Sequence, residues 1–279
     1  MIIDIQGLFE KYLKEMVKQN PDKLANAEQL EQNIGKLTEH FNNAKIKALG
    51  GLSPIEYVNK LCLEHELFDY VDDCLESGYE ISDIVCDRLA CEEGVIEYLK
   101  PLLVSNIKDA PMFAAEMMKT IASNDSEKVF LEVLTNDNYS QAVKDVAFEF
   151  LCDERPSVVD VILEQLPQLT EDKQGILVEV LAYYKGNKAI FYWLVTMFYR
   201  AGDVALYAKL LGEYGDESAI DILKSFAKEN DIDFVEYVEI RNAVESLGGE
   251  FDIEKDFSQD ELAKYVHTIS EKGETSEQE

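Results

Sequence analysis

The stretch LGEYGDESAIDIL at residues 211–223 contains the end of one helix and the start of the next. Gly215 fits the position just after a helix, where glycine tolerates a positive φ. Asp216 fits the N-cap of the following helix, because its carboxylate can accept hydrogen bonds from the free N–H groups there. Beyond it, Ala219, Ile220 and Leu223 share one helical stripe. The stretch therefore predicts two short amphipathic helices joined by a tight turn.

Similar turns recur along most of the chain. The successive gaps are 31, 29, 32, 29 and 33 residues, counted between Gly94, Asp125, Glu154, Gly186, Gly215 and Gly248. The expected helices before these turns are Val143–Cys152, Ile176–Tyr184, Val204–Tyr214 and Phe234–Leu247. Those expected after them are Val158–Leu166, Ala189–Tyr199 and Ala219–Phe226. A fixed period of this length is typical of stacked helix pairs that bury their apolar faces jointly, and the absence of period-two alternation favours an all-α fold.

The turn at residues 211–223 resembles the junction of a HEAT-like repeat, and the turn from Ala243 to Gly249 resembles it again. A proline that is common in this family two residues after the alanine is Asp221 here. The resemblance implies an α-solenoid (α/α superhelix) of HEAT-like antiparallel helix pairs, which would place a binding surface on its concave face. It identifies a fold and not a function.

The N-terminal region differs from the repeats. Residues 4–19 and 21–42 read as two helices, the second opened by Asn20 and Pro21. A Ser53/Glu56 capping box then starts a further helix at Pro54. We expect an N-terminal helical module at 1–52, a HEAT-like domain at 53–270, in which Ser258 caps a last helix, and a disordered acidic tail at 271–279.

The charge of the chain is strongly acidic and unevenly placed. The formal net charge is −30, yet residues 1–60 contain eight acidic and eight basic side chains, so the excess lies in residues 61–279. Such a surface repels nucleic acid and anionic membranes. Two interpretations remain, a surface that serves solubility alone or one that attracts a basic partner, including mimicry of nucleic acid toward a nucleic-acid-binding protein. No signal peptide or membrane span is recognisable, and we expect a cytoplasmic protein.

Catalytic, cofactor and metal motifs are not found in the sequence, so we expect no catalytic residues, cofactor or metal. The five cysteines form no Cys-x-x-Cys pair and are expected to be mostly buried free thiols. Residues 64–87 contain nine carboxylates. Of these Asp69, Asp72, Asp73 and Glu76, together with His65, would share a helical face that could hold a divalent cation. Because Leu67, Phe68 and Val71 supply an opposite apolar face, a solvated face is the favoured interpretation.

Nine aromatic residues crowd residues 183–214. Tyr192 and Tyr199 are seven positions apart and share a face of the expected helix, whereas Trp193 lies about 100° away, toward the apolar stripe. We expect Trp193 to be buried and the two tyrosines to be at least partly accessible on the inner, concave side of the curve. A partner would bind there, because tyrosine is over-represented where binding energy concentrates. The favoured function is a non-catalytic scaffold for a protein or peptide partner, with a basic partner as one option. Two alternatives stay open: a HEAT-like accessory of an enzyme system, as in the bilin lyase relatives that carry this repeat, and an acidic decoy for a nucleic-acid-binding protein.

Overall fold

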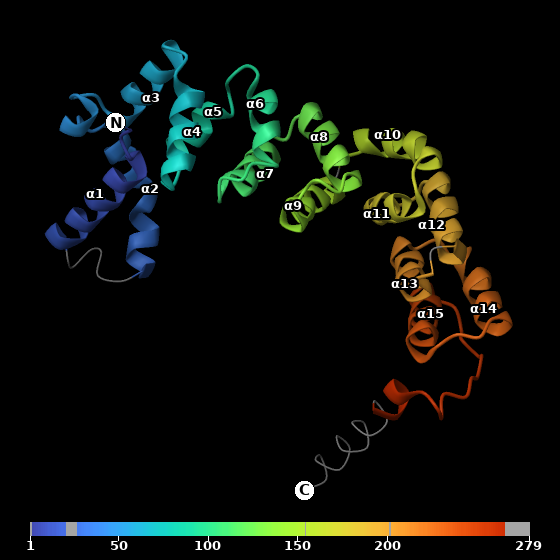
Figure 1. Cartoon of the computed structure of the whole chain (residues 1–279). Coiled ribbons are helices and arrows are strands. Elements are labelled where there is room, and N and C mark those ends of the chain that lie inside the picture. Colours follow the sequence, from blue (N-terminus) through green and yellow to red (C-terminus); the bar gives the residue numbers. More distant parts are fainter. Residues whose placement is uncertain (1, 21–26, 154, 201, 266–279) are drawn as a thin grey trace, which may run out of the picture. The chain divides into compact units, whose positions relative to one another are not determined.

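The protein is helical throughout the part of the chain that the structure describes. The computed structural model describes residues 2–20, 27–153, 155–200 and 202–265. Within these ranges it contains α-helices and two short 3-10 helices, η1 and η2, and no strand (Figure 1). The all-α prediction is therefore confirmed. The chain forms two compact units, Met1–Ala147 and Phe148–Glu279.

Unit 1 consists of short helices that pack mainly on their neighbours in sequence. Its elements are α1 (Ile5–Gln19), α2 (Ala27–Asn43), η1 (Lys47–Leu49), α3 (Pro54–Leu63), α4 (Leu67–Ser77), α5 (Asp83–Leu89), α6 (Val95–Leu102), α7 (Ala110–Ile121) and α8 (Asn124–Thr135). The next helix, α9 (Gln141–Cys152), contains the division between the units. Ser53 and Glu56 form the predicted capping box at the start of α3. The boundary expected near residue 52 lies within unit 1 and stays a prediction.

The first two helices are joined to the rest of unit 1 by aromatic and hydrogen-bond contacts. The Phe9 ring of α1 lies 5.1 Å from the ring of Phe41, which is buried on α2. The Tyr70 hydroxyl of α4 donates a 2.8 Å hydrogen bond to the Ile3 carbonyl. Helix α2 also contacts α3. The N-terminal helices are therefore packed against the following ones.

Unit 2 contains most of the helices that the sequence period predicted. They are α10 (Ser157–Gln165), η2 (Leu166–Gln168), α11 (Glu171–Leu181), α12 (Lys188–Arg200), α13 (Val204–Tyr214), α14 (Ala219–Glu229) and α15 (Phe234–Ser246). The seven predicted helices at 143–247 differ from the observed bounds by at most a few residues. The 3.6-residue period locates most of these helices because each buries an apolar stripe, whereas α11 is buried on several sides and its start was predicted five residues late.

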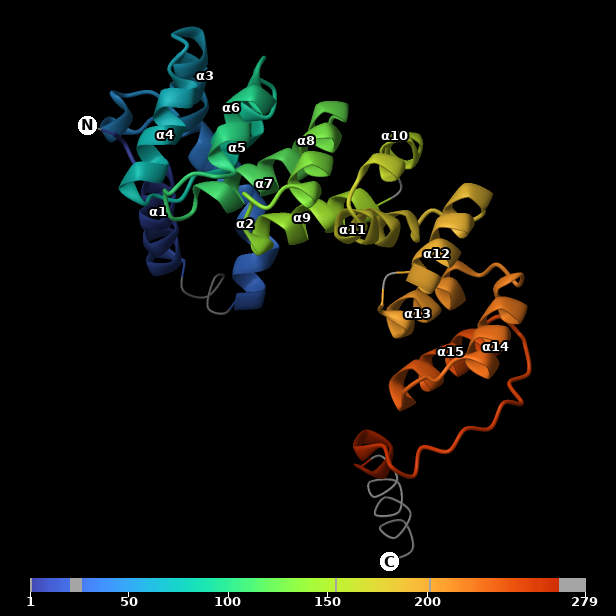
Figure 2. The same ribbon diagram turned by 45° about the vertical axis from the view of Figure 1, so that its right-hand side comes forward.

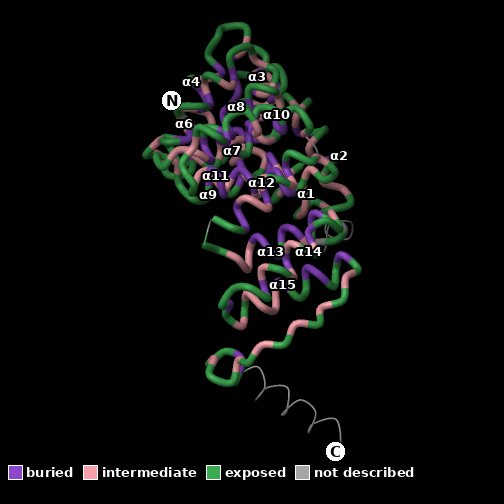
Figure 3. Tube along the Cα trace, turned by 90° about the vertical axis from the view of Figure 1, so that its right-hand side faces the viewer, coloured by how far each residue is buried: buried purple, intermediate pink, exposed green. Residues whose placement is uncertain are grey.

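The closest packing in unit 2 is between α13 and α15, which lie side by side in Figures 1 and 2. Gly212 makes this approach possible. A Cβ added there would lie 2.8 Å from Ala243 Cα and 3.0 Å from Ser246 Oγ on α15. Buried and exposed residues alternate along α13 and α15 in Figure 3, as expected for helices packed on one face.

The turns between helices follow the predicted glycines where glycine is present. Gly94, Gly186, Gly215 and Gly248 all have positive φ, between 75° and 85°. Asp125 was wrong as a turn residue, because it lies in the first turn of α8 and the turn is made by Ala122 with φ 53°. Glu154 lies outside the described residues.

Two predicted helix caps are shifted in the structure. Ser218, and not Asp216, is the N-cap of α14. The Asp216 carboxylate lies two residues before it and accepts a 2.9 Å hydrogen bond from the Ser218 N–H. Asp260, and not Ser258, accepts from the N–H groups of Leu262 and Ala263. The predicted tail at 271–279 and the predicted helix start at Pro21 lie outside the described residues.

No helix in the described ranges has the length and apolarity needed to cross a bilayer.

Three tyrosine hydroxyls form hydrogen bonds to residues well before them in the chain. Tyr184 and Tyr214 reach earlier turns, whereas Tyr98 of α6 reaches the middle of α4. In unit 2, the Tyr184 hydroxyl lies 2.7 Å from the Asp153 carbonyl, and the Tyr214 hydroxyl accepts from the Asn187 N–H and donates to the Asn187 carbonyl, both at 2.8 Å. In unit 1, the Tyr98 hydroxyl donates to Asp72 Oδ1 at 2.7 Å. Each hydroxyl reaches 26 to 31 residues back along the chain. We call these contacts the tyrosine ties.

Candidate functional site

The outward face of α12 presents the two tyrosines selected from the sequence. Tyr192 is 69% exposed and Tyr199 is 56% exposed. Exposed Ala189 and half-buried Thr196 lie on the same side of the helix at helical spacing, and the Thr196 hydroxyl donates to the Tyr192 carbonyl. The predicted accessibility of both tyrosines is therefore confirmed, and their role in binding stays a prediction.

Tyr199 is more firmly placed than its exposure suggests. Its ring makes an edge contact with Phe226 of α14 at 5.6 Å, and Phe226 also contacts the buried Phe198 ring at 4.6 Å. The expectation that Trp193 is buried was wrong, because its side chain is only half-buried. Trp193 lies between the outward face and the stripe of Ile190 and Met197, which is the buried one.

The segment that carries these tyrosines lacks negative charge. Residues 180–202 contain no Asp or Glu, the longest such stretch in a chain with 56 carboxylates. Three cations lie in it, Lys185, Lys188 and Arg200, and Arg200 lies 3.8 Å from Glu171. We call residues 180–202 the acid-free segment. Aromatic enrichment with few acidic side chains is the composition of protein–protein interface cores.

A hollow of about 390 Å³ lies at the beginning of the acid-free segment. It is lined by Ala182, Tyr183, Lys185, Leu210 and Glu213. Tyr183 is 58% exposed, and its ring makes an edge contact with Phe148 at 6.2 Å. The sequence placed Tyr183 in the aromatic cluster but did not single it out, because its position after the last turn of α11 does not reveal a neighbouring hollow.

Glu179 lies half-buried one turn before Tyr183. Burial is the main cause that raises the pKa of the Glu179 carboxyl above its usual value, and the negative charge of Asp203 adds to the rise. Burial also raises the pKa of the nearby Cys152 thiol to about 12. Because a thiolate is the reactive form of cysteine, Cys152 is a poor nucleophile at neutral pH.

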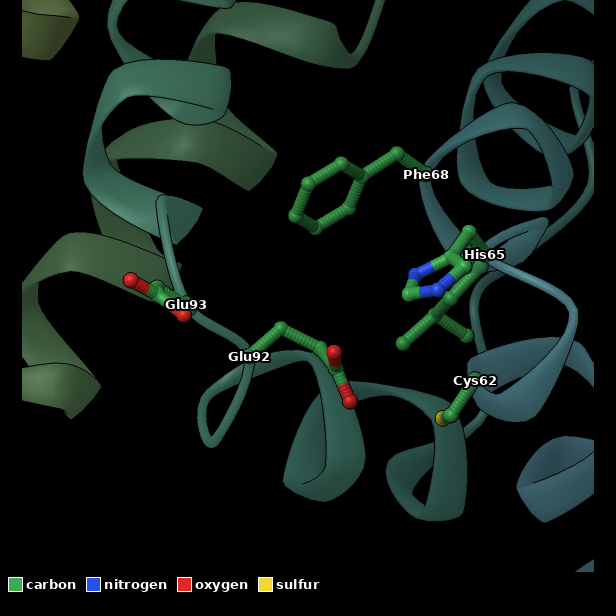
Figure 4. A pocket seen from close by; sticks show the side chains of 6 residues that line it. Cys62, His65, Phe68, Glu92 and Glu93 are labelled. Atoms are coloured by element: carbon green, nitrogen blue, oxygen red, sulfur yellow. The ribbon is translucent and has the colours of Figure 1, made fainter.

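Unit 1 contains a second hollow, of about 350 Å³, which we call the α4 hollow. Figure 4 shows side chains from three places around one opening. Cys62 is at the end of α3, His65 is in the turn before α4, and Phe68 is at the start of α4. Glu92 and Glu93 are in the turn before α6. Its remaining lining residue is Leu67. The sequence did not indicate this hollow, because its sides are about 30 residues apart.

One arginine organises the base of the α4 hollow. Arg88 Nε donates to the Cys62 sulfur at 3.0 Å, and Arg88 Nη2 lies 3.0 Å from Glu92 Oε1. That oxygen is shielded from solvent but accepts no aligned hydrogen bond. Burial raises the pKa of Cys62, Arg88 lowers it and Glu92 raises it, with a net rise. Cys62 is therefore a protonated thiol and not an activated nucleophile.

The Phe68 ring is held rigidly at the side of the α4 hollow. It stacks on Tyr98 of α6 with ring centres 4.3 Å apart and planes 5° apart. The hydroxyl of the stacked Tyr98 ring is itself fixed by the tyrosine tie to Asp72, which holds the stack in place. Hydrogen bonding to Asp72 and burial both raise the pKa of Tyr98, with burial the larger cause, so the hydroxyl stays protonated.

The predicted acidic helix face is corrected in one respect. His65 does not belong to it, because His65 has φ 59° and forms the turn between α3 and α4. Asp69, Asp73 and Glu76 are exposed on α4, as the favoured interpretation expected. Within the described ranges no group of three His, Cys, Asp or Glu side chains is placed to hold a metal ion.

Cys91 is exposed, contrary to the expected burial of the cysteines, whereas Cys74 is buried.

A third hollow, of about 280 Å³, lies between α1 and α2. The Tyr12 hydroxyl lies 2.8 Å from His40 Nδ1 at its side, and Met16 and Leu37 give it apolar walls. Its chemistry is that of a packing gap between two helices with one polar pair.

Comparison of the chain with protein-family models, with curated proteins and with solved structures finds no match.

Proposed function

We propose that this protein is a non-catalytic binding protein, and that the outward face of α12 contacts a protein or peptide partner. The observation that carries the proposal is the exposure of Tyr192 and Tyr199, 69% and 56%, on one face of a helix without a carboxylate. Exposed aromatic side chains cost hydration free energy in the unbound protein, and a partner that covers them recovers it.

The two tyrosines would contribute in different ways. Tyr199 is already positioned by Phe226, so little side-chain entropy is lost when a partner packs on it. Tyr192 is the more exposed and would lose more freedom, but it offers a larger apolar area. Together they give the large, rigid and partly polar contact surface that is favoured in binding hot spots.

The arrangement of the helices as HEAT-like repeats is part of this proposal. The tyrosine ties support it, because Tyr184 and Tyr214 hold equivalent positions 30 residues apart and contact equivalent turns. The positive φ of Gly186 and Gly215 at the two turns supports it as well. A stack of such pairs forms an extended concave surface, which is the surface that repeat proteins use for binding. A crystal structure in which the helices after Gly186 and Gly215 run in opposite directions would contradict it.

The proposal is tested with a partner captured from the native cell and identified by mass spectrometry. The purified partner is titrated against three proteins: the parent chain, the double variant Tyr192→Ser/Tyr199→Ser, and the control Tyr79→Ser. Tyr79 is 40% exposed in unit 1 and far from α12 in sequence. The double variant should bind at least about 30-fold more weakly, as for the loss of roughly 2 kcal/mol at a hot spot.

The control variant should keep the parent affinity. Circular dichroism and the melting temperature establish that all three proteins are folded. Equal affinities for the parent and the folded double variant would refute the role of α12.

A further inference from the structure

The α4 hollow combines three features: a volume of about 350 Å³, a rigid aromatic side and carboxylates at its rim. It lies in unit 1 and shares no residue with the tyrosine face of α12. Its chemistry is therefore independent of the function proposed above.

The charge around the hollow is one-sided. Residues 61–99 contain twelve carboxylates and one cation other than histidine, Arg88. Ion pairs in this segment of the described chain are limited to Lys60 with Glu64 and Arg88 with Glu92. Glu93 lines the hollow, is exposed and has no cation beside it. Ten of the twelve carboxylates thus have no ion-pair partner, and the local potential attracts a cation.

The walls of the hollow favour a flat cation. Tyr98 covers one face of the Phe68 ring, and the rest of the Phe68 side chain lines the hollow. A guanidinium group stacks on aromatic surfaces and binds a carboxylate through two parallel N–H groups, whereas an ammonium is a compact and strongly hydrated charge. The Glu92 carboxylate at the base is already paired with Arg88, so Glu93 at the rim is the lining carboxylate left for an incoming cation.

The chain itself provides an example of this recognition. Arg88 places its guanidinium between the Cys62 sulfur and the Glu92 carboxylate on one side of the same hollow. On the other side, Glu93 and Phe68 have no such cation. We propose that the α4 hollow takes the guanidinium of an arginine side chain presented by a basic protein segment.

The surrounding surface fits an extended arginine-rich segment better than a free small molecule. Beyond the hollow, Asp69, Asp73 and Glu76 continue along α4 as exposed carboxylates. Leu63, next to Cys62, is 82% exposed and offers an apolar contact to a longer ligand. One arginine would enter the hollow while its neighbours meet the carboxylates of α4.

The experiment uses the full chain and three fluorescein-labelled nonapeptides. They alternate glycine with arginine, with lysine or with citrulline, the neutral analogue of arginine, and fluorescence anisotropy gives the dissociation constants at low salt. The arginine peptide should bind about threefold or more tightly than the lysine peptide, because stacking on Phe68 adds to charge. The citrulline peptide should not bind measurably.

Two matched variants locate the site. Glu93→Gln removes a carboxylate from the rim and should weaken binding of the arginine peptide about tenfold, as for one charge-assisted hydrogen bond. Glu80→Gln removes an exposed carboxylate of the same acidic segment that does not line the hollow, and should change affinity less than about twofold. The Tyr192→Ser/Tyr199→Ser protein should bind the arginine peptide like the parent.

Phe68→Leu should equalise the arginine and lysine affinities. If this variant fails to fold, the comparison of Glu93→Gln with Glu80→Gln still decides. Equal binding of the arginine and lysine peptides by the parent, equal losses in the two glutamate variants, or no binding of the arginine peptide would each overturn the proposal.

Discussion

Residues 61–99 and the acid-free segment 180–202 differ sharply in charge. The first contains twelve carboxylates and the second contains none. Both carry exposed apolar groups, Leu63 in the first and Tyr192 and Tyr199 in the second. The difference indicates that a net charge of −30 is not spread evenly for solubility, since an even spread would not leave 23 consecutive residues without a carboxylate.

The comparison also separates two modes of binding. A partner of the acid-free segment would be held by apolar and aromatic area, which is insensitive to salt. A ligand of the α4 hollow would be attracted by charge over distances set by the Debye length. The two regions therefore make opposite predictions under the same change of conditions.

The largest expected effect tests the division of α12 into an inner and an outer side. Phe198 is 1% exposed and next to Tyr199 in sequence. Phe198→Ala should lower the free energy of unfolding by about 3–5 kcal/mol, because it removes a core ring and leaves a cavity. Tyr192→Ser should lower it by less than about 0.5 kcal/mol, as at other surface positions. Urea denaturation measures both, and similar losses would place Tyr192 in the core and end the comparison.

Salt should separate the two regions next. Between 0.01 and 1 M salt the Debye length falls from roughly 30 Å to 3 Å. Affinity of the arginine peptide for the α4 hollow should fall on the order of 10–100-fold over this range. Affinity of a partner that contacts α12 should change by less than about threefold. Anisotropy titrations at four salt concentrations measure both, and a parallel decline would show that charge governs each region.

The tyrosine ties should matter equally in both regions, despite their difference in charge. Tyr214→Phe removes the hydroxyl that pairs with the N–H and the carbonyl of Asn187 and should cost about 1–2 kcal/mol of stability. Tyr98→Phe removes the donor to Asp72 and should cost a similar amount. Chemical denaturation of the two variants tests this equivalence. A cost for one variant alone would mean that the ties are not equivalent parts of a repeat.

The smallest expected effect concerns Glu179, the last carboxylate before the acid-free segment. Its folded-state pKa is raised, so between its usual pKa and this raised value the folded protein binds more protons than the unfolded chain. The free energy of unfolding therefore falls as pH rises through that window. Glu179→Gln should stabilise the protein at pH 7.5 by less than about 1 kcal/mol, and the gain should vanish below pH 4.

Thermal melts at several pH values measure the effect of Glu179→Gln. The control is Glu164→Gln, at an exposed position of α10, which should leave the melting temperature unchanged. A gain that persists at low pH would point to packing instead of charge.

Helices that bury one stripe at a 3.6-residue period could be predicted from sequence, and α13 was found with its observed bounds, Val204–Tyr214. Turns were predictable where glycine marks them, as at Gly215, and were missed at Ala122, where a residue with a Cβ adopts a positive φ. The exposure of Tyr192 and Tyr199 followed from the same period. The half-burial of Trp193 did not, because it depends on how closely neighbouring helices approach one side of α12.

The α4 hollow could not be predicted for a different reason. It depends on bringing Cys62 and Phe68 near Glu92. Helix α5 separates Phe68 from Glu92 in sequence, and both α4 and α5 separate Cys62 from it. Only the packing of α3 with α5, and the stack of Phe68 on Tyr98, creates that proximity. The sequence revealed the charge of this region but not its concave shape.

The tyrosine ties of unit 2 have a consequence for how this region opens. The Tyr184 hydroxyl holds the turn at Asp153, and the turn that follows Tyr184 is held in its place by Tyr214 through Asn187. Releasing one turn therefore removes a hydrogen-bond partner from the next. The three turns, at Asp153, at Asn187 and at Gly215 directly after Tyr214, should open together and not one at a time. In hydrogen-exchange measurements their backbone amides should share one opening free energy, and Tyr214→Phe should split that single cooperative unit in two.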